Sequence, residues 1–406
     1  MDRVVDRRVV VTGLGPVSSI GTGVAEFGAA LRAGRSGVAP ITSFDTTGFP
    51  HVVAGEVPDF APGDHLRVLD AAEWGRSSLF AASAARLAAE DAKIDPAVLS
   101  AARSGSCVGT TSGESRVLQQ LSGEWVADGF AASSPDAVGK LPASRLALAV
   151  NRELGLTGEA MTLSTACAAA NYAIGYAYDL IASGEADYMV AAGADSTVRW
   201  AHAGFYRLGA LAEHASAPFD RDRSGVITAE GGCALFLESL DSALSRGAFI
   251  YAEVMGYGLT CDANHPVAPD PVGIAKCIRK AHDSAGIVPS DVDYICAHGT
   301  GTAANDLAEA QAVKEVFGDR PPPMSSIKSM LGHTMGAASG FGAIAAILGI
   351  TEGFLPPTVN YRTPDPALAG IDPVPNRSRP ARLDVVQNNG FAFGGNNAIT
   401  IFGRLG

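Results

Sequence analysis

Apolar residues along this chain gather in short, nearly continuous runs that end in glycine or in Gly-Thr. Examples are residues 7–15, 106–110 and 186–193. Runs of this kind are typical of strands buried on both faces, and the glycine marks a junction where the backbone passes closely. Alanine-rich stretches with helical spacing lie between them, and two of these are stopped by proline. The pattern predicts an α/β fold with parallel or mixed sheets covered by helices.

The order of these elements repeats weakly in the second half of the chain. Five pairs of segments match in kind: 7–15 with 250–258, 89–96 with 282–289, 106–110 with 294–300, 186–193 with 383–390, and 231–238 with 396–402. Two such halves would pack with pseudo-twofold symmetry, and their strand ends would converge on one central region. A site there would draw residues from both halves.

We expect the halves to span residues 1–249 and 250–406. No Pro/Ser-rich linker separates them, which predicts one rigid unit. Residues 125–145 break the repeat and are expected to form an insertion that provides a dimer contact or a pocket wall.

Composition excludes several classes of protein. The net charge is −12 without a run of Lys or Arg, so neither nucleic acid nor an anionic membrane is an expected partner. The charged fraction of 18% is low, which favours a large core and a buried subunit interface. We expect no membrane span and no signal peptide. The six cysteines are scattered without metal-ligand spacing, so we expect reduced thiols, no metal site and a cytoplasmic location.

Cys167 stands at a predicted junction from strand to helix. Residues 160–166 favour a strand and residues 168–183 a helix, so the thiol lies at a helix N-terminus. Free N–H groups and the helix dipole there would pull its pKa below the usual ~8.5. The N–H groups at such a turn can also donate to an oxyanion. A packing cysteine is the alternative that local sequence leaves open.

His298 and His333 each lie next to glycine, at the end of a strand or before a helix rich in small residues. Glu309 shares a helical stripe with Val313 and is therefore beside an apolar face, on a helix capped by Asn305 or Asp306. A buried carboxylate needs a cationic or hydrogen-bonding partner, for which Lys328 is the natural candidate. Structural histidines and a solvated helix face remain the alternatives.

Four ordered motifs carry a family resemblance across nearly the whole chain: TACAAA around Cys167, HGTGTxxNDxxE from His298 to Glu309, SIKSMLGH from Ser326 to His333, and GFAFGGNN from Gly390 to Asn397. Together they resemble the elongating β-ketoacyl-ACP synthases of the Cys-His-His type, found in fatty-acid synthesis and type II polyketide synthases. The resemblance implies a thiolase-like fold with duplicated α-β-α-β-α layers.

The resemblance also implies roles for these residues. Cys167 would carry the acyl chain, and His298 and His333 would donate hydrogen bonds to the malonyl thioester carbonyl as carbon dioxide departs. Lys328 and Glu309 would form a supporting ion pair. A thiolate exchanges thioesters readily, and neutral imidazoles stabilise an enolate without protonating it.

Further roles follow by motif position. Thr300 and Thr302 would position the malonyl carboxylate and pantetheine. The N–H groups of Cys167 and Phe393 would form the oxyanion hole, and Phe391 and Phe393 would gate the cysteine. The substrates would arrive on the phosphopantetheine arm of acyl carrier protein, without a cofactor.

The chain departs from the family pattern in its gate motif, NGFAFGGNN, where Gly390, Ala392 and Asn396 replace Ser, Gly and Thr. Ala392 would stiffen the gate if its backbone needs a positive φ. Few basic residues are left to dock an acidic carrier protein. Arg67 and Arg207 are weak candidates for that role.

Related functions on the same fold fit less well. A non-decarboxylating thiolase needs a second cysteine near the C-terminus, but the last one is Cys296. A starter-unit synthase would carry Asn at the position of His333, and a non-catalytic chain-length subunit would lack Cys167. The altered gate favours iterative polyketide elongation, with housekeeping fatty-acid synthesis as the alternative.

The second subunit follows from the insertion. Gly139 and Lys140 stand where fatty-acid relatives place bulky aromatic residues that close a pocket across the dimer. We therefore expect a dimer, with a heterodimer that includes a chain-length-factor-like sister subunit favoured over a homodimer.

Overall fold

A continuous mixed β-sheet runs through the whole molecule. The structure, a computed structural model, describes residues 7–406. Across this part of the chain the strands follow the order β11 (Met324–Ser325), β10 (Tyr294–Cys296), β14 (Val385–Phe391), β15 (Asn396–Gly403), β9 (Ala252–Cys261), β1 (Val9–Ser18), β8 (Gly231–Ser239), β7 (Tyr188–Asp195), β5 (Ser104–Gly109) and β6 (Ala160–Leu163), with β2 (Gly21–Thr22) paired to β1. Two short pairs lie apart from it: β3 (Ala39–Pro40) with β4 (Val53–Ala54), and β12 (Phe354–Leu355) with β13 (Arg379–Pro380).

The two halves of this sheet repeat one topology. From the centre outward the first half runs β1-β8-β7-β5-β6 and the second β9-β15-β14-β10-β11. In each half the first two pairings are antiparallel and the last two are parallel. The halves join where β1 and β9 pair antiparallel. All four matched strand segments of the sequence occupy equivalent places, so the predicted duplication is confirmed.

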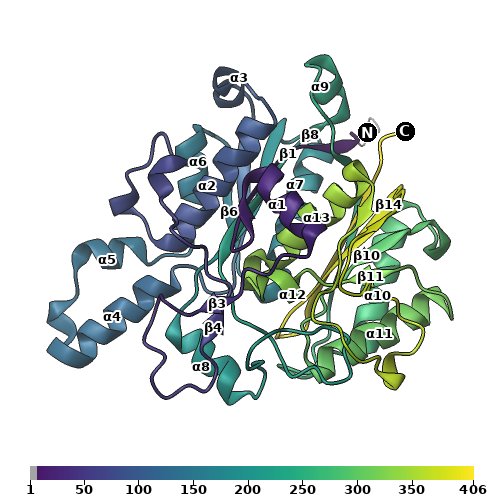
Figure 1. Cartoon of the computed structure of the whole chain (residues 1–406). Coiled ribbons are helices and arrows are strands. Elements are labelled where there is room, and N and C mark those ends of the chain that lie inside the picture. Colours follow the sequence, from purple (N-terminus) through teal and green to yellow (C-terminus); the bar gives the residue numbers. More distant parts are fainter. Residues whose placement is uncertain (1–6) are drawn as a thin grey trace.

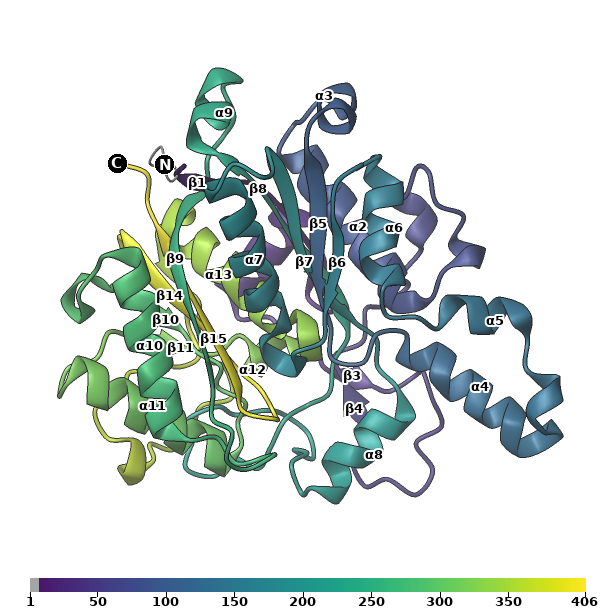
Figure 2. The ribbon, with the colours of Figure 1, turned by 180° about the vertical axis from the view of Figure 1, so that it is seen from behind.

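Helices make the remaining layers (Figures 1 and 2). The α-helices are α1 (Gly23–Ala33), α2 (Arg76–Asp91), α3 (Pro96–Ala101), α4 (Ser115–Asp128), α5 (Pro135–Lys140), α6 (Arg145–Leu154), α7 (Ala169–Ala182), α8 (Arg199–Arg207), α9 (Leu240–Ser245), α10 (Pro271–Ala285), α11 (Ala303–Phe317), α12 (Lys328–Leu331) and α13 (Ala338–Glu352). Short 3₁₀ helices are η1 (Pro62–Asp64), η2 (Ala71–Glu73), η3 (Phe130–Ala132), η4 (Ala166–Ala168), η5 (Pro289–Asp291), η6 (Met335–Ala337) and η7 (Pro366–Leu368).

These helices sandwich the two halves of the sheet. Helix α2 packs on β1 and β8, and α10 packs on β9 and β15, which makes the two outer layers. Helices α7 and α13 pack on strands of opposite halves and against each other, which makes the shared middle layer. The arrangement is the expected α-β-α-β-α fold. The division at residues 249 and 250 stays a prediction, and it falls in the loop between α9 and β9.

The middle layer contains the most apolar helical segment. Residues Met335–Glu352, which cover η6 and α13, are apolar and long enough to span a membrane by composition and length. However, 89% of this window is buried inside the protein. Its position between the two halves of the sheet is that of a core helix.

An arm formed by α4, η3 and α5 projects from the body of the molecule (Figures 1 and 2). The arm begins at Ser115, ten residues before the insertion expected from the sequence. The reason is that the whole of α4 belongs to the segment that breaks the repeat. Val117, Leu121 and Ala137 form a small apolar cluster of its own. Val126 and Phe130 are 90% and 77% exposed, so the arm presents large apolar side chains to its surroundings.

Candidate active site

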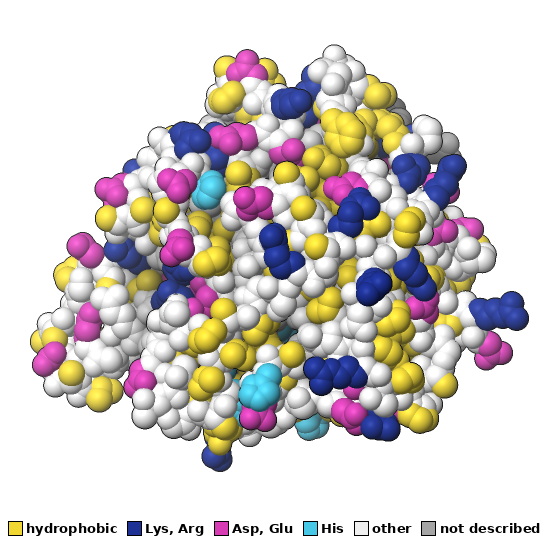
Figure 3. Space-filling model, in the orientation of Figure 1, with side chains coloured by type: hydrophobic (Ala, Val, Ile, Leu, Met, Phe, Trp, Pro, Cys, Tyr) yellow, Lys and Arg dark blue, Asp and Glu magenta, His cyan; other side chains and the backbone are white. Residues whose placement is uncertain are grey.

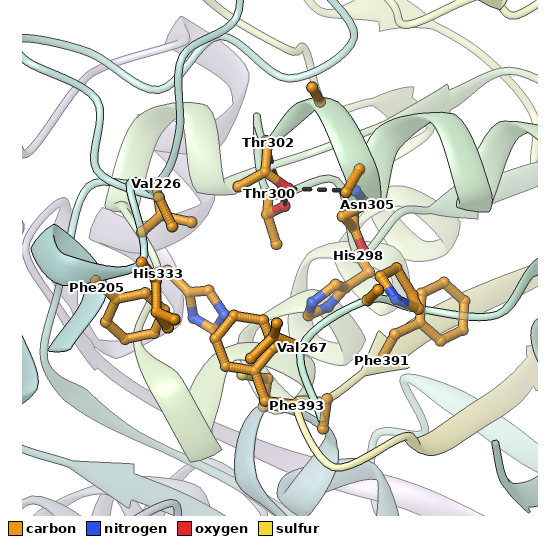
Figure 4. Close-up of a pocket in the computed structure, with 18 of the residues that line it drawn as sticks. Phe205, Val226, Val267, His298, Thr300, Thr302, Asn305, His333, Phe391 and Phe393 are labelled. Carbon is orange, nitrogen blue, oxygen red and sulfur yellow. Dashed lines mark hydrogen bonds between the residues drawn. The ribbon is translucent and has the colours of Figure 1, made fainter. Parts of the chain in front are cut away.

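A cavity of about 400 Å³ opens where the two halves meet. It brings together most residues expected from the sequence: Cys167, His298, Thr300, Thr302, His333, Phe391 and Phe393. Figure 4 shows the rings of His298 and His333 facing each other across this space. Cys167 comes from the first half and both histidines from the second, as the duplication predicted.

Local backbone geometry places Cys167 between a strand and a helix. Strand β6 ends at Leu163, Cys167 lies in η4, and α7 follows at Ala169. Ala166 has a φ of +49°, a left-handed conformation that side chains other than glycine adopt at an energetic cost. Strain of this kind persists where the surrounding structure holds it, often at functional sites. The turn directs the thiol into the cavity.

The lowered pKa that the sequence predicted for Cys167 was wrong. Burial raises the pKa of the thiol to about 11, while the charge of Lys328 and the backbone of Phe393 and of Cys167 act in the opposite direction. The sequence showed the helix N-terminus but not the depth of burial, which removes the thiolate from water. The backbone of Phe393 and of Cys167 interacts with the sulfur, and the oxyanion hole expected at these N–H groups stays a prediction.

Both histidines are neutral at pH 7. Burial, the charge of Lys328 and the neighbouring imidazole hold the pKa of His298 well below its usual range. Burial and Lys328 do the same for the pKa of His333. Their ring centroids are 5.7 Å apart. The Nδ1 atom of His333 accepts the N–H of Met335 at 3.0 Å, so its Nε2 carries the hydrogen and can donate.

Glu309 and Lys328 do not form the direct ion pair expected from the sequence. Among residues 7–406, the hydrogen bonds of these two side chains go to other groups. Instead, Glu309 accepts the N–H groups of His298 and Gly299 at 2.8 Å each, and Lys328 Nζ donates to the carbonyl oxygen of His298 at 2.6 Å. Asn389 adds a third donor to Glu309 at 2.9 Å. Both charged groups therefore hold the main chain at His298.

Burial disfavours the charged forms of both Glu309 and Lys328. Burial raises the pKa of Glu309, against the hydrogen bonds from Asn389, Gly299 and His298. It lowers the pKa of Lys328, against the nearby negative groups that include Glu309. The opposite charges thus support each other across the His298 peptide without touching.

The prediction of Asn305 or Asp306 as the N-cap of α11 was also wrong. The helix begins at Ala303, and its N-cap is Thr302, whose hydroxyl accepts the N–H of Asn305. Asp306 lies in the first turn and accepts the N–H groups of Phe219 and Gly301. The sequence offered several capping residues in a row, and only the direction of the incoming chain selects among them. The hydroxyls of Thr300 and Thr302 lie 2.9 Å apart at the cavity wall.

Three phenylalanines surround the histidines (Figure 4). The ring of Phe391 lies 5.6 Å from that of His298, and Phe393 is partly exposed in the loop that follows β14. Phe205 on α8 lies 5.8 Å from Phe393 and 6.4 Å from His333. Sequence reasoning missed Phe205, because α8 carries no motif. Ala392 does not have a positive φ, so the condition for a stiffened gate is not met; Gly394 and Gly395 do.

Asp195 is a second residue that the sequence did not reveal. It ends β7, is fully buried, and accepts the hydroxyl of Thr110 and the N–H groups of Thr111, Ser112 and Gly336. It thereby ties the loop after β5 to η6, just beyond His333. The sequence signal that could have revealed Asp195 is its position at the end of an apolar strand.

Arg67 and Arg207 lie apart. Arg207 is exposed at the end of α8, next to Leu208 and Gly209 of the cavity lining. Arg67 does not line the cavity; it donates to the carbonyls of Asp64 and Leu66. The surface in Figure 3 mixes Lys and Arg with Asp and Glu, without a large basic field on that face. Within residues 7–406 no cluster of His, Cys, Asp or Glu could hold a metal ion.

The geometry combines a buried thiol, N–H donors beside it, and two neutral imidazoles in one largely apolar cavity. Thiols exchange acyl groups as thioesters. Preorganised neutral donors in a water-poor site stabilise an oxyanion or enolate as it forms. The arrangement is thus able to hold an acyl chain and to activate a second acyl unit beside it.

Comparison with known proteins agrees with this chemistry. The N-terminal domain of β-ketoacyl synthases matches residues 6–243, and the C-terminal domain matches residues 251–362. The chain is 38% identical to 3-oxoacyl-(acyl-carrier-protein) synthase 2 of Synechocystis sp., over 98% of each protein.

Solved structures of ketosynthases are similar to the chain. It superposes with a TM-score of 0.97 and 50% identity on the ishigamide ketosynthase/chain length factor, covering 99% of this chain and all of that one. The chain is also similar to the ketosynthase in a structure of a type II PKS acyl-carrier protein in complex with its ketosynthase (AntDE:AntF), with a TM-score of 0.90 and 31% identity over 99% of this chain and 100% of that one. The chain therefore belongs to the β-ketoacyl synthase family and is an elongating ketosynthase of the Cys-His-His type.

Proposed function

We propose that this enzyme elongates polyketide chains iteratively, by decarboxylative Claisen condensation of malonyl-ACP with an acyl chain held on Cys167. The observation that carries the polyketide assignment is the likeness to the ishigamide ketosynthase/chain length factor, with which the chain shares 50% of its residues over 99% of its length. Housekeeping fatty-acid elongation is the second candidate, supported by the 3-oxoacyl synthase relative.

The first step loads the cysteine. Cys167 Sγ attacks the thioester carbonyl of acyl-ACP, a new C–S bond forms, and the pantetheine sulfur leaves. Because the pKa of this thiol is raised, the thiol is protonated at rest, and its proton ends on the departing pantetheine thiol. The N–H groups of Cys167 and Phe393 receive the negative charge of the tetrahedral intermediate.

The second step breaks a C–C bond in malonyl-ACP. Carbon dioxide leaves, and the bonding electrons become the enolate of the acetyl thioester. His298 and His333 donate hydrogen bonds to its oxygen, and because both are neutral they do not protonate its carbon. Thr300 and Thr302 lie at the wall where the malonyl group and pantetheine would pass.

The third step forms the product. The enolate carbon attacks the Cys167 thioester, and the oxyanion hole again holds the charge. Collapse of the intermediate releases the Cys167 sulfur as a thiolate and leaves β-ketoacyl-ACP. The thiolate takes up one proton from solvent, which restores the resting thiol. The sequence of steps needs no cofactor. We place it in the cytoplasm, where reduced thiols persist.

Acyl carrier protein is the proposed substrate carrier. Arg207 is exposed next to the cavity lining and is the better placed of the two basic candidates. Arg67 lies on another part of the surface and is occupied by local carbonyls. We therefore assign carrier docking to the surface around Arg207.

A second subunit is proposed from two exposed features. Strand β6 forms an edge of the sheet, and edge strands readily pair with another chain. The arm presents Val126 and Phe130, and a Cβ atom added at Gly139 would meet no atom of residues 7–406 within 4 Å. The arm is thus built to pack on a partner. Because the chain resembles a ketosynthase/chain length factor, we propose a sister subunit and not a second copy.

Purified enzyme would test both proposals. The chain is expressed alone and together with a homologous subunit that lacks the active cysteine, and each preparation is sized by light scattering. Each then receives malonyl-ACP and acyl-ACPs that are either saturated or keep a β-keto group or double bond. Intact ACP mass spectrometry reports elongation.

We expect the heterodimer to extend oxidised or unsaturated chains repeatedly, and the chain alone to be inactive or aggregated. A fully active homodimer that extends only saturated chains would favour fatty-acid synthesis and overturn the polyketide proposal.

A further inference from the structure

Buried amide side chains line one face of β14, behind the active site. Gln387 and Asn389 are two residues apart and point to the same face of the strand, while Asn388 points to the other. Gln387 and Asn389 are almost completely buried, in a core formed by α10, α11 and the second half of the sheet (Figure 2). Polar groups in such a core are destabilising unless each is hydrogen-bonded.

These amides connect His282 on α10 to Glu309 on α11. His282 Nε2 lies 2.8 Å from Gln387 Oε1, Gln387 Nε2 donates to Asn389 Oδ1 at 2.7 Å, and Asn389 Nδ2 donates to Glu309 Oε1 at 2.9 Å. Glu309 and Gln387 have no exposed surface, and His282 and Asn389 are buried. The four side chains form one continuous hydrogen-bonded relay.

The direction of the relay is determined from its end. The two oxygens of Glu309 already accept the N–H groups of His298 and Gly299, so Asn389 must present its NH₂ group to the carboxylate. Its oxygen then faces Gln387 and needs a donor, which the NH₂ group of Gln387 supplies. The oxygen of Gln387 in turn requires His282 to donate from Nε2.

The two catalytic imidazoles are held differently. His333 is oriented through its own ring, because its Nδ1 accepts the N–H of Met335. The Nδ1 atom of His298 is buried and has no hydrogen-bond partner in the described part of the chain. The position of His298 therefore depends on its main chain, which Glu309 and Lys328 clamp.

We propose that His282, Gln387 and Asn389 are positioning residues, which orient Glu309 and through it set the imidazole of His298 for malonyl decarboxylation. The proposal rests on the decarboxylative function given above. The ring of Phe317, perpendicular to His282 at 5.5 Å, holds the outer end of the relay. The step in which Cys167 accepts an acyl group does not use the relay.

The test compares two rates on one preparation. The double variant His282→Leu/Gln387→Leu removes both partners of the outer hydrogen bond at once, and it leaves Asn389 Oδ1 without its donor. Cys167 acylation by acyl-ACP is followed by intact mass, and malonyl-ACP decarboxylation by carbon dioxide release. We expect acylation at the wild-type rate and a decarboxylation kcat about tenfold lower, a fraction of the ~10² to 10³ lost with a whole oxyanion donor.

Two further variants separate positioning from folding. His282→Gln places an NH₂ group near the position of Nε2 and should restore most of the decarboxylation rate. Ser106→Ala/Asn151→Leu removes a buried hydrogen bond of 2.6 Å in the other half and should not separate the two rates.

Wild-type decarboxylation by the His282→Leu/Gln387→Leu variant, or an equal loss of both rates, would overturn the relay. A wild-type enzyme that neither accepts acyl groups nor releases carbon dioxide would instead overturn the proposed function.

Discussion

The ammonium group of Lys328 donates a 2.6 Å hydrogen bond to the main-chain carbonyl oxygen of His298. On the other side of the same residue, the N–H of His298 is held by Glu309. A catalytic imidazole is thus fixed through its backbone by two buried charges of opposite sign, while its ring stays free to meet a substrate.

Removal of Glu309 should destabilise the fold. Glu309→Ala would leave the N–H groups of His298 and Gly299 without an acceptor and the buried charge of Lys328 uncompensated. The expected loss is about 3–5 kcal/mol in the free energy of unfolding. Urea unfolding of the variant measures it, with exposed Glu315→Ala as the control. An unchanged unfolding midpoint would show that the carboxylate of Glu309 does not stabilise the fold.

Replacement of the nucleophile should abolish acyl loading. Cys167→Ala removes the thiol that lines the cavity, and the small side chain suits the apolar surroundings. After incubation with acyl-ACP, intact-protein mass spectrometry should show added acyl mass on the wild type and none on the variant. Equal acylation of both proteins would assign the acyl group to another residue.

The raised pKa of Cys167 predicts a steep pH dependence. Only the thiolate reacts with iodoacetamide, and with a pKa of about 11 its fraction is very small at neutral pH. The alkylation rate should therefore rise about tenfold for each pH unit between about 7 and 10. A Cys261→Ser background removes the exposed thiol from the measurement. A rate that levels off below about pH 9 would indicate the acidic thiol expected from the helix N-terminus alone.

Loss of either imidazole should separate the half-reactions. His298→Ala and His333→Ala should still accept an acyl group on Cys167, but malonyl decarboxylation should fall by about 10² or more. Because burial holds the pKa of both rings well below the usual value, the wild-type rate should not decline as pH falls from about 7.5 to 6. Carbon dioxide release measures both effects. Wild-type release by both variants would remove the histidines from this step.

Much of the fold was predictable because its signals are local. The apolar runs that became β1 and β9, or β7 and β14, are short segments with their own glycine signals, and their repetition revealed the symmetry. Cys167, His298 and His333 were likewise marked by small residues at strand ends, where a motif only a few residues long carries the chemistry.

The tertiary structure alone decided how these residues are supported. Glu309 and Lys328 lie on either side of His298 in the folded site. Each hydrogen-bonds to the main chain of His298 and not to the other side chain, because these main-chain groups are nearer. Burial raised the pKa of Cys167 where the sequence predicted a lower one, since burial depends on everything packed around a residue. The relay joins His282 to Gln387, 105 positions apart. Hydrogen-bond partners and burial are set by distant segments meeting, and no local pattern encodes them.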